Sequence, residues 1–539
     1  DMQKKVIPRH RLNKKDPIAS ISEAREPIVY YLDPGAPEPV KTALLEGARW
    51  WAEAFAAIGY ENAFQVKVLP DDADPMDVRY NVIQWVHRAT RGWSYGSSVI
   101  DPRTGEIIKG HVTLGSLRVR QDMKIAQGLL APFNQQNESE LKAQIEAMAL
   151  ARIRQLSAHE IGHTLGIAHN FAASPQDRAS VMDYPHPLVT LTTDGTVSLE
   201  NAYDSGLGEW DKQVIAYGYS DFGGMPSEAD QLARILADNN AKGLDFISDS
   251  DARPASGAHP TAHLWDNGSD PVTELQRVLA LRQQVLQGFG QAQLGNDQPL
   301  SDLQEVLVPM YLLHRYQTEA AVKVIGGVNY RYYMNSDNPS DYGPLGAANQ
   351  QRALKQLLAT VSADTLQLPQ QVQQLMVPLA YGSYDNRERF NGRTGLVPDP
   401  VSWAATAADF SLSLLFNSAR LNRLQQQHAA DNNVPSAAGV VNQVAKQVLE
   451  QWQQQPADVL RQRLLTTAFN AMVNAVQADQ LAPEVHLALR SALATQQQKL
   501  ASADQSLAQE LAKQLQRFLE EGEWPASYQP HAMPPGSPI

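Results

Sequence analysis

The stretch HEIGHTLGIAH, at residues 159–169, places three histidines, a glutamate and two glycines at fixed spacing. Residues four apart on an α-helix lie ~40° apart around the axis and ~6 Å apart along it, so His159 and His163 can direct two imidazoles at one ion. Gly166 can leave the helix in a left-handed conformation that residues with a Cβ disfavour. The chain can then turn back and bring His169 to the same ion. The stretch therefore predicts a metal site with these three histidines as ligands.

Glu160 lies ~100° around the helix from His159, beside the ion rather than behind it. Three neutral imidazoles leave the fourth tetrahedral position of a zinc ion to water, which is the arrangement of catalytic rather than structural sites. Zinc lowers the pKa of that water toward ~7. Glu160 can accept its proton as general base and pass it to a leaving amine. The pattern therefore indicates one catalytic Zn²⁺ and a hydrolytic reaction.

Chance is a poor explanation for this stretch. For a chain of 539 residues with 13 histidines, five such matches arise in about 2 in 10⁵ chains of ordinary composition. The alternative is a buried helix whose histidines are satisfied by hydrogen bonds. It would require three histidines and a glutamate to gather at one place without a shared partner, so the pattern favours metal binding.

A second motif, Ser180-Val181-Met182-Asp183-Tyr184, follows the third histidine, with Met182 13 residues after His169. The pattern HExxHxxGxxH resembles the metzincin signature, and metzincins carry a Met-turn downstream that forms the floor of the zinc site. The resemblance implies that Met182 lies beneath the histidines as an apolar base and is not a ligand. It also implies that Tyr184 can ligate zinc and swing to stabilise the oxyanion, as in the astacin-like and serralysin-like branches. The alternative for Tyr184 is a packing role.

The chain as a whole most resembles large bacterial zinc-dependent metallopeptidases with a Met-zincin domain. Asn170, which follows the third ligand, is not the usual residue of the best-known metzincin branches. The resemblance implies a zinc-dependent endopeptidase that acts on peptides or proteins and is secreted or periplasmic. Two alternatives stay open: a non-catalytic binding protein that keeps the zinc fold as a scaffold, and an amidase or other hydrolase with the same metal site. Glu160 speaks against the scaffold, which would not need a base.

The metzincin resemblance also suggests where the substrate binds. In that fold an edge strand above the zinc pairs with the substrate backbone, which holds an extended peptide across the metal. The run from Lys109 to Gly115 is the candidate, because it precedes the long active-site helix. The alternative is an interior strand. The predicted substrate-binding residues are Gly110, His111, Val112, Thr113 and Leu114.

The pattern along the chain predicts an α+β fold. Residues 28–32 form a β-rich run, and a helix with apolar residues at helical spacing follows Pro39. Two strands flank the turn from Asp101 to Gly105. A helix begins near Asn137 and runs to Leu165. We therefore expect a metzincin-like catalytic domain, with a mixed sheet and an active-site helix, followed by a mostly α-helical C-terminal region.

Changes in composition predict five segments. They are an N-terminal arm or linker at residues 1–26, the catalytic domain at 27–225, connecting loops at 226–270, a mainly helical region at 271–524, and a loose Pro-rich tail at 525–539. The basic arm is expected to be solvated, since termini are often free of contacts.

Composition excludes several other classes. The formal net charge is −13, which argues against a nucleic-acid partner because phosphate binding needs a basic footprint. No apolar run approaches the ~20 residues of a membrane span. The chain has no cysteine, so a Cys-ligated zinc and a thiol nucleophile are excluded. The sequence gives no prediction of the oligomeric state.

A calcium site is possible from composition but is not supported by spacing. Calcium takes six to eight oxygen ligands, and the chain has a group of acidic and amide side chains after residue 248. Turn-forming and capping roles explain these residues better, since they follow no EF-hand spacing. The residues are Asp249, Asp251, Asp266, Asn267 and Asp270.

Overall fold

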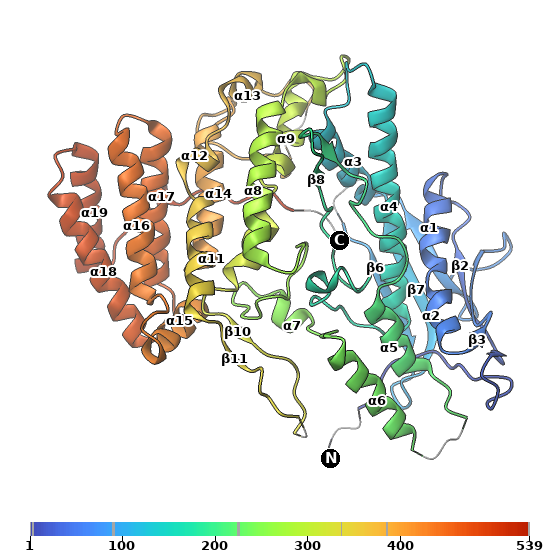
Figure 1. Ribbon diagram of the computed structural model, residues 1–539. Helices are drawn as coiled ribbons and strands as arrows, with labels where there is room; N and C mark the ends of the chain where they lie inside the picture. The colour runs from blue at the N-terminus through green and yellow to red at the C-terminus, as the bar shows by residue number, and fades with distance from the viewer. Residues whose placement is uncertain are drawn as a thin grey trace.

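A five-stranded sheet forms the frame of the N-terminal half, with the strand order β4-β2-β5-β7-β6 in the computed structural model (Figure 1). The structure describes residue 2 and residues 5–88, 92–223, 227–335, 337–383 and 386–536. Neighbouring strands are parallel except β6, which runs antiparallel to β7. The strands are β2 (Ile28–Leu32), β4 (Phe64–Val68), β5 (Asn81–Val86), β6 (Tyr95–Ile100) and β7 (Ile107–Gly115).

The hairpin between β6 and β7 forms at the predicted turn. Gly105 has φ +80° and its N–H donates to the carbonyl of Asp101 at 2.8 Å. The predicted position of the second strand at the sheet edge is wrong, because β7 lies between β5 and β6. Burial of β7 explains this: Val112 and Leu114 on one face are completely buried and Thr113 on the other is 4% exposed, as in a strand covered on both faces. The edge strand is β6.

A long helix, α4 (Glu138–Thr164), crosses this sheet and carries the first two histidines. It packs against α1 (Val40–Arg49), and a Cβ on Gly47 would lie 1.9 Å from the carbonyl oxygen of Arg154, so the two helices cross at backbone contact. The Trp51 indole N–H donates to the carbonyl of Ala158 at 2.8 Å. These contacts fix the depth at which α4 lies in the core. The neighbouring helices are α2 (Trp51–Ala57), α3 (Leu117–Leu130) and α5 (Glu209–Tyr219).

The N-terminal segment is not a solvated arm, contrary to the sequence prediction. The backbone of Arg9 pairs with the hairpin turn, donating to the carbonyl of Gly105 at 3.0 Å. His10 is buried, and its Nε2 lies 3.0 Å from the carbonyl oxygen of Thr164 at the end of α4. Further along, β1 (Ser22–Glu23) pairs with β3 (Tyr60–Glu61). The segment packs because its polar groups reach backbone acceptors that the fold leaves open.

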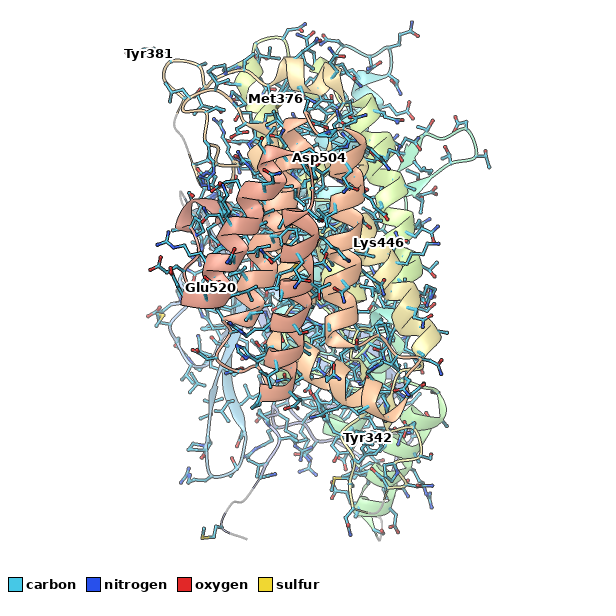
Figure 2. All side chains as sticks on the ribbon, turned by 90° about the vertical axis from the view of Figure 1, so that its left-hand side faces the viewer. Tyr342, Met376, Tyr381, Lys446, Asp504 and Glu520 are labelled. Atoms are coloured by element: carbon cyan, nitrogen blue, oxygen red, sulfur yellow. The ribbon has the colours of Figure 1, made fainter. Side chains whose placement is uncertain are left out.

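The C-terminal half is helical, as predicted, and Figure 1 shows its helices beside the sheet domain. The longer helices are α8 (Pro271–Gly288), α9 (Leu303–Tyr311), α10 (Arg315–Val322), α11 (Ala347–Ala359), α14 (Pro400–Leu415), α15 (Ser418–Ala430), α16 (Ala437–Gln454), α17 (Val459–Val476), α18 (Pro483–Ala501) and α19 (Ser506–Glu521). Figure 2 views them from their outer side, where Lys446, Asp504 and Glu520 are exposed.

The two halves share one hydrophobic core. Ile125 of α3 and Met148 of α4 belong to the same buried cluster as Leu275 of α8 and Leu307 of α9. The sheet domain has a second core around Trp51. The predicted boundary at residue 271 therefore does not separate two independent hydrophobic cores.

The segment predicted as connecting loops contains two helices, α6 (Glu228–Ala241) and α7 (Asp249–Ala252). Its apolar residues Ile247, Ala252 and Ala262 pack against Phe171 and Tyr184 in a third cluster. This segment is therefore a wall of the histidine site and not only a connection.

The C-terminal tail is docked rather than loose through residue 536. Arg315 Nη2 donates to the carbonyl of Pro534 at 2.8 Å, and Thr406 Oγ1 donates to the carbonyl of His531 at 3.2 Å. The remaining short elements are β8 (Thr190–Leu191), β9 (Val197–Ser198), β10 (Val328–Asn329), β11 (Gly343–Pro344), α12 (Ala363–Leu366), α13 (Gln370–Leu375) and the 3₁₀ turns η1 (Ser174–Gln176), η2 (Gln291–Gln293), η3 (Leu300–Asp302) and η4 (Ala526–Tyr528).

None of the helices in the described parts of the chain is both long enough and apolar enough to cross a bilayer.

Candidate metal centre

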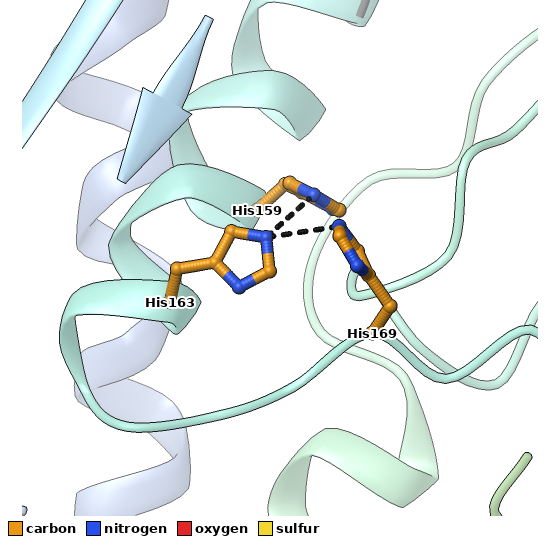
Figure 3. Close-up of side chains that lie close together, drawn as sticks. All are labelled: His159, His163 and His169. Atoms are coloured by element: carbon orange, nitrogen blue, oxygen red, sulfur yellow. Dashed lines mark hydrogen bonds between the residues drawn. The ribbon is translucent and has the colours of Figure 1, made fainter. Parts of the chain in front are cut away.

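The three predicted ligands come together at the end of α4 (Figure 3). His159 and His163 project from successive turns of the helix, and His169 reaches them from the loop that follows. The Nε2 atom of His163 lies 3.2 Å from Nε2 of His159 and 3.1 Å from Nε2 of His169. In the described chain, no other set of three or more His, Asp or Glu side chains is grouped closely enough to hold an ion.

Each of these imidazoles has an acceptor at its other nitrogen. His159 Nδ1 lies 2.7 Å from the carbonyl oxygen of Val181, and His163 Nδ1 lies 2.9 Å from that of Ile167. His169 Nδ1 lies 2.8 Å from Oδ2 of Asp249. An Nδ1–H that donates to such an acceptor leaves Nε2 with a lone pair and no proton. The three facing Nε2 atoms are therefore acceptors without a donor between them.

This donor set fits a zinc ion. Tetrahedral zinc with Zn–N bonds of ~2.0–2.1 Å separates its nitrogen ligands by ~3.3 Å, close to the separations above. Burial lowers the pKa of His163 to about 4 and that of His159 well below its usual value. Both imidazoles are thus neutral at physiological pH, as zinc ligands must be. The carbonyl and carboxylate acceptors hold the rings in one orientation, as outer-sphere partners of metal ligands do.

Glycines let the chain pass through this site without steric conflict. Gly166 has φ +92°, and a Cβ there would lie 1.9 Å from the carbonyl oxygen of Pro8. A Cβ on Gly162, between the two helical histidines, would lie 2.2 Å from Sδ of Met182. The first glycine makes the turn toward His169, and the second admits the methionine beneath the helix.

The segment from Ser180 to Tyr184 lies beneath the histidines. Met182 is completely buried, and the carbonyl of Val181 holds His159 as described above. Asp211 of α5 anchors this turn: it accepts a hydrogen bond from Ser180 Oγ at 2.7 Å and from the Val181 N–H at 2.8 Å. The turn is therefore fixed independently of the histidines.

Glu160 is buried beside the histidines, with 1% of its surface exposed. Its Oε1 has no hydrogen-bond partner in the described part of the chain. Burial raises the pKa of Glu160 to about 8, against the opposing effects of the Arg152 cation and of a hydrogen bond from the Gly96 backbone. A buried carboxylate oxygen without a protein partner is rare and is available to a small molecule at the metal.

A family model described as Met-zincin matches residues 142–456, more than half of the chain, and this range contains the histidines, Glu160 and the methionine turn. The chain belongs to the Met-zincin family. The comparison with curated proteins and the comparison with solved structures gave no match. The family and the histidine triad together support a zinc metallopeptidase, and the family predicted from the sequence is confirmed.

Tyr184 of this Met-zincin lies at the same site. Its ring centroid is 4.7 Å from that of His169 and 5.2 Å from that of His159. Its hydroxyl accepts a hydrogen bond from Arg253 Nη2 at 2.9 Å. Burial raises the pKa of Tyr184 to about 12, although Arg253 acts in the opposite direction, so the phenol is neutral at physiological pH. The ring stacks on Trp265 with centroids 5.2 Å apart.

Three site residues were missed by the sequence reasoning: Asp211, Asp249 and Arg253. Asp249 is the first residue of α7, and Arg253 directly follows this helix. Asp249 lies 80 residues after His169 in the sequence. The sequence indicates Asp249 only as a calcium candidate, and no local pattern relates it to His169. The spacing of Asp249 and Arg253, four residues apart, is a usual ion-pair spacing on a helix, and this was the one available signal.

The residues predicted to bind substrate lie inside the sheet. His111, Val112 and Leu114 of β7 pair with β5 on one side, and the same strand pairs with β6 on the other. A Cβ on Gly110 would lie 2.6 Å from the hydroxyl of Tyr30. Their backbone groups are already paired, so the predicted pairing with a peptide is wrong for β7.

The five residues considered for calcium are not gathered. Asp249 binds His169, and Asp251 accepts hydrogen bonds from the Tyr330 and Tyr332 hydroxyls at 2.6 and 2.5 Å. Asp270 caps α8, accepting from the N–H of Thr273 at 2.8 Å. The structure gives no support to a calcium site among these side chains.

Asn170, the unusual residue after the third ligand, has a structural role. Its amide nitrogen donates to the carbonyl of Asp245 at 2.9 Å, and its oxygen accepts from the N–H of Ile247 at 3.3 Å. Its own backbone N–H donates to the carbonyl of Met182 at 3.1 Å. Asn170 thus joins the histidine loop, the methionine turn and the segment that leads to α7.

Proposed function

We propose that this Met-zincin is a zinc-dependent endopeptidase in which Glu160 is the general base. The observation that carries the proposal is the convergence of three neutral Nε2 atoms next to a buried carboxylate oxygen that has no protein partner. A scaffold protein would have no use for that oxygen.

His159, His163 and His169 would hold a zinc ion, which would lower the pKa of a bound water molecule toward ~7 and polarise a carbonyl group. The chain supplies the remaining chemistry. A zinc cation beside Glu160 would oppose the effect of burial and favour its ionised form, so that Oε1 could take the proton from the attacking water and then deliver it to the leaving amine. Burial of Glu160 excludes bulk water from this transfer. The hydroxyl of Tyr184 donates a hydrogen bond to the developing oxyanion.

The edge strand β6 is the proposed site for the substrate backbone. A Cβ on Gly96 would lie 2.2 Å from the carbonyl oxygen of Glu160, so β6 lies directly on the helix that carries the base. Among the described residues, its outer edge carries no other strand of the sheet, and Tyr95 and Val99 expose 45% and 57% of their surfaces. A peptide that extends the sheet at β6 would run past Glu160 and the histidines. A secreted or periplasmic location, where protein substrates are met outside the cytoplasm, belongs to the same proposal and rests on the family resemblance.

The test compares wild type, Glu160→Gln and Glu146→Gln on an unstructured protein substrate, with zinc content measured for each. Glu146 is an exposed residue of the same helix and serves as the control. We expect equal zinc content in all three proteins and cleavage by wild type and Glu146→Gln alone. Equal cleavage by the Glu160→Gln protein, or wild type without zinc, would contradict the proposal. Cleavage of cell-wall amides but no peptide would show an amidase instead.

A further inference from the structure

One carboxylate joins a zinc ligand to an arginine at this site. Asp249 Oδ2 accepts the Nδ1–H of His169 at 2.8 Å, and Oδ1 of the same carboxylate accepts the Nε–H of Arg253. Arg253 Nη2 then donates to the hydroxyl of Tyr184 at 2.9 Å. The hydrogen bonds run from His169 through Asp249 and Arg253 to Tyr184, so these four side chains have fixed positions relative to one another.

The direction of the last hydrogen bond decides what Tyr184 can do. A guanidinium group only donates hydrogen bonds, so the Tyr184 oxygen is the acceptor and the phenolic hydrogen is left for another partner. In the described part of the chain, Arg253 is the one hydrogen-bond partner of this hydroxyl. The phenolic hydrogen therefore has no acceptor in the described part of the chain and is available to another partner.

The Tyr184 ring is held too tightly for a large movement. It is 4% exposed and stacks on Trp265, and Phe171 meets it edge-on with centroids 5.3 Å apart. The backbone N–H of Trp265 also donates to the carbonyl of Tyr184 at 2.8 Å. A side chain enclosed in this way acts from a fixed position, and a preorganised donor has no reorganisation to undergo at the moment of reaction.

We propose that Arg253 is a positioning residue that holds the Tyr184 hydroxyl as a preformed donor to the oxyanion of the reaction. Asp249 sets the position of Arg253 and of the ligand His169 together. The inference rests on the proposed peptidase function and deepens it: the donor is fixed by Arg253 and does not swing into place. The guanidinium charge also lies where it favours the development of negative charge on the oxygen that Tyr184 contacts.

Residues of the C-terminal half of the chain form hydrogen bonds to α7, the short helix that carries Asp249. Asp251 binds the hydroxyls of Tyr330 and Tyr332, which lie between β10 and β11. Lys323 is buried and donates to the carbonyls of Ala252 and Ala262 at 2.6 and 2.7 Å. These bonds fix the C-terminal end of α7, which gives Asp249 and Arg253 the rigid support that a positioning role needs.

The chain contains a matched control for Arg253. Arg331 forms a salt bridge of 2.8 Å with Asp341, and the hydroxyl of Tyr333 donates to the same carboxylate at 2.7 Å. This second Arg–Asp–Tyr group has a similar exposure, with 33% of the Arg331 side chain and 38% of the Arg253 side chain accessible, but it includes none of the histidine ligands.

The experiment measures kcat and KM on an internally quenched peptide for Arg253→Gln, Arg253→Lys and Arg331→Gln, with zinc content and Tm for each protein. We expect Arg253→Gln to lose about 10- to 100-fold in kcat, less than the about 10²- to 10³-fold that removal of an oxyanion donor costs. KM and zinc content should stay within about twofold, since Arg253 contacts neither ligand nor base in the ground state. Arg253→Lys, which keeps the charge and loses the planar fork, should lie between wild type and Arg253→Gln. Arg331→Gln should match wild type.

A double variant separates positioning from general support. If Arg253 acts through Tyr184, Arg253→Gln should reduce kcat by no more than about twofold in a Tyr184→Phe background, because residues that act as a unit are not additive. Millimolar guanidinium should restore part of the kcat of Arg253→Ala and leave Tyr184→Phe unchanged. A kcat of Arg253→Gln within twofold of wild type, or fully multiplicative effects in the double variant, would overturn the inference. If Arg253→Gln does not fold, the same two measurements are made on Arg253→Lys: its kcat relative to wild type, and its effect on kcat in the Tyr184→Phe background. Wild type without peptidase activity would instead contradict the proposed function.

Discussion

The carbonyl oxygen of Pro8 lies against Gly166 so closely that a Cβ at this glycine would come within 1.9 Å of it. Beside this contact, the hydroxyl of Tyr219 donates to the carbonyl of Leu165 at 2.8 Å. The N-terminal segment and α5 therefore hold the point at which the chain leaves α4 and turns toward His169.

Gly166→Ala should displace this turn. An alanine would be strained at the positive φ of Gly166, which costs about 1–3 kcal/mol. Its Cβ would also clash with the backbone of Pro8, which cannot move aside as a flexible side chain could. We expect a lower Tm and reduced zinc content, measured by calorimetry and metal analysis. Gly218→Ala is the control, because nothing lies within 4 Å of its Cβ position and alanine favours a helix interior. A Gly166→Ala protein that binds zinc as wild type does would contradict this account of the turn.

Removal of zinc should destabilise the folded chain. A cation would relieve the repulsion between the three facing Nε2 lone pairs. A ligand that binds only the folded state raises the free energy of unfolding by about 2.7 kcal/mol when its concentration is a hundred times its Kd. Treatment with 1,10-phenanthroline should lower Tm, and added Zn²⁺ should restore it. Added Ca²⁺ should leave Tm unchanged, since the acidic residues named as calcium candidates are not gathered. A Tm that rises with added Ca²⁺ would point to a calcium site.

Asp249→Asn should weaken zinc binding. The carboxylate accepts the Nδ1–H of His169 and keeps its Nε2 free of a proton, and loss of such a partner costs about 10- to 100-fold in metal affinity. A competition titration with a chromogenic chelator measures the change. Asp341→Asn removes a carboxylate that also binds an arginine and a tyrosine, and its zinc affinity should equal that of wild type. Equal affinities for wild type and Asp249→Asn would show that the ligand is oriented without this bond.

Two buried carboxylates beneath the site should make stability depend on pH. Burial raises the pKa of Asp266 to about 7, and burial together with Asp266 raises that of Asp183 well above its usual value. The folded chain therefore holds a proton that the unfolded chain releases above pH ~4. The stability that this proton contributes is complete below that pH and is lost as the pH rises to about 7.

Asp266→Asn removes this proton binding. The Tm of the variant relative to wild type should therefore rise between pH 5 and pH 8. Asp364→Asn is the control, since the Asp364 side chain is 85% exposed, and its Tm difference from wild type should stay constant. A constant difference for Asp266→Asn as well would show that the carboxylate pair does not retain a proton.

The grouping of the three histidines could be predicted from the sequence because it is local. His159, Glu160 and His163 share one helix whose period fixes their relative directions, and Gly166 makes the one turn that His169 needs. The Met-zincin family and the helical C-terminal region were predicted as well, the first from motif and the second from periodicity.

The residues around the ligands could not be predicted, because they depend on contacts between distant segments. Asp249 reaches His169 across 80 residues, and no period or turn signal encodes that pairing. The sequence also could not show which strand of the β6–β7 hairpin lies at the edge of the sheet, because either strand of a hairpin can be the outer one. Burial of the β7 side chains on both faces decides between them, and burial is a property of the assembled sheet.

The fastening of α7 by Lys323, Tyr330 and Tyr332 has a consequence for biosynthesis. A nascent chain that has emerged through α5 already contains all three ligands, the base and the methionine turn, but Asp249 and Arg253 have no rigid support until about a hundred further residues have left the ribosome. Under the proposed peptidase function, the chain would therefore reach its full rate only after the helical half has begun to fold, because a shorter nascent chain would lack the rigid support of Asp249 and Arg253.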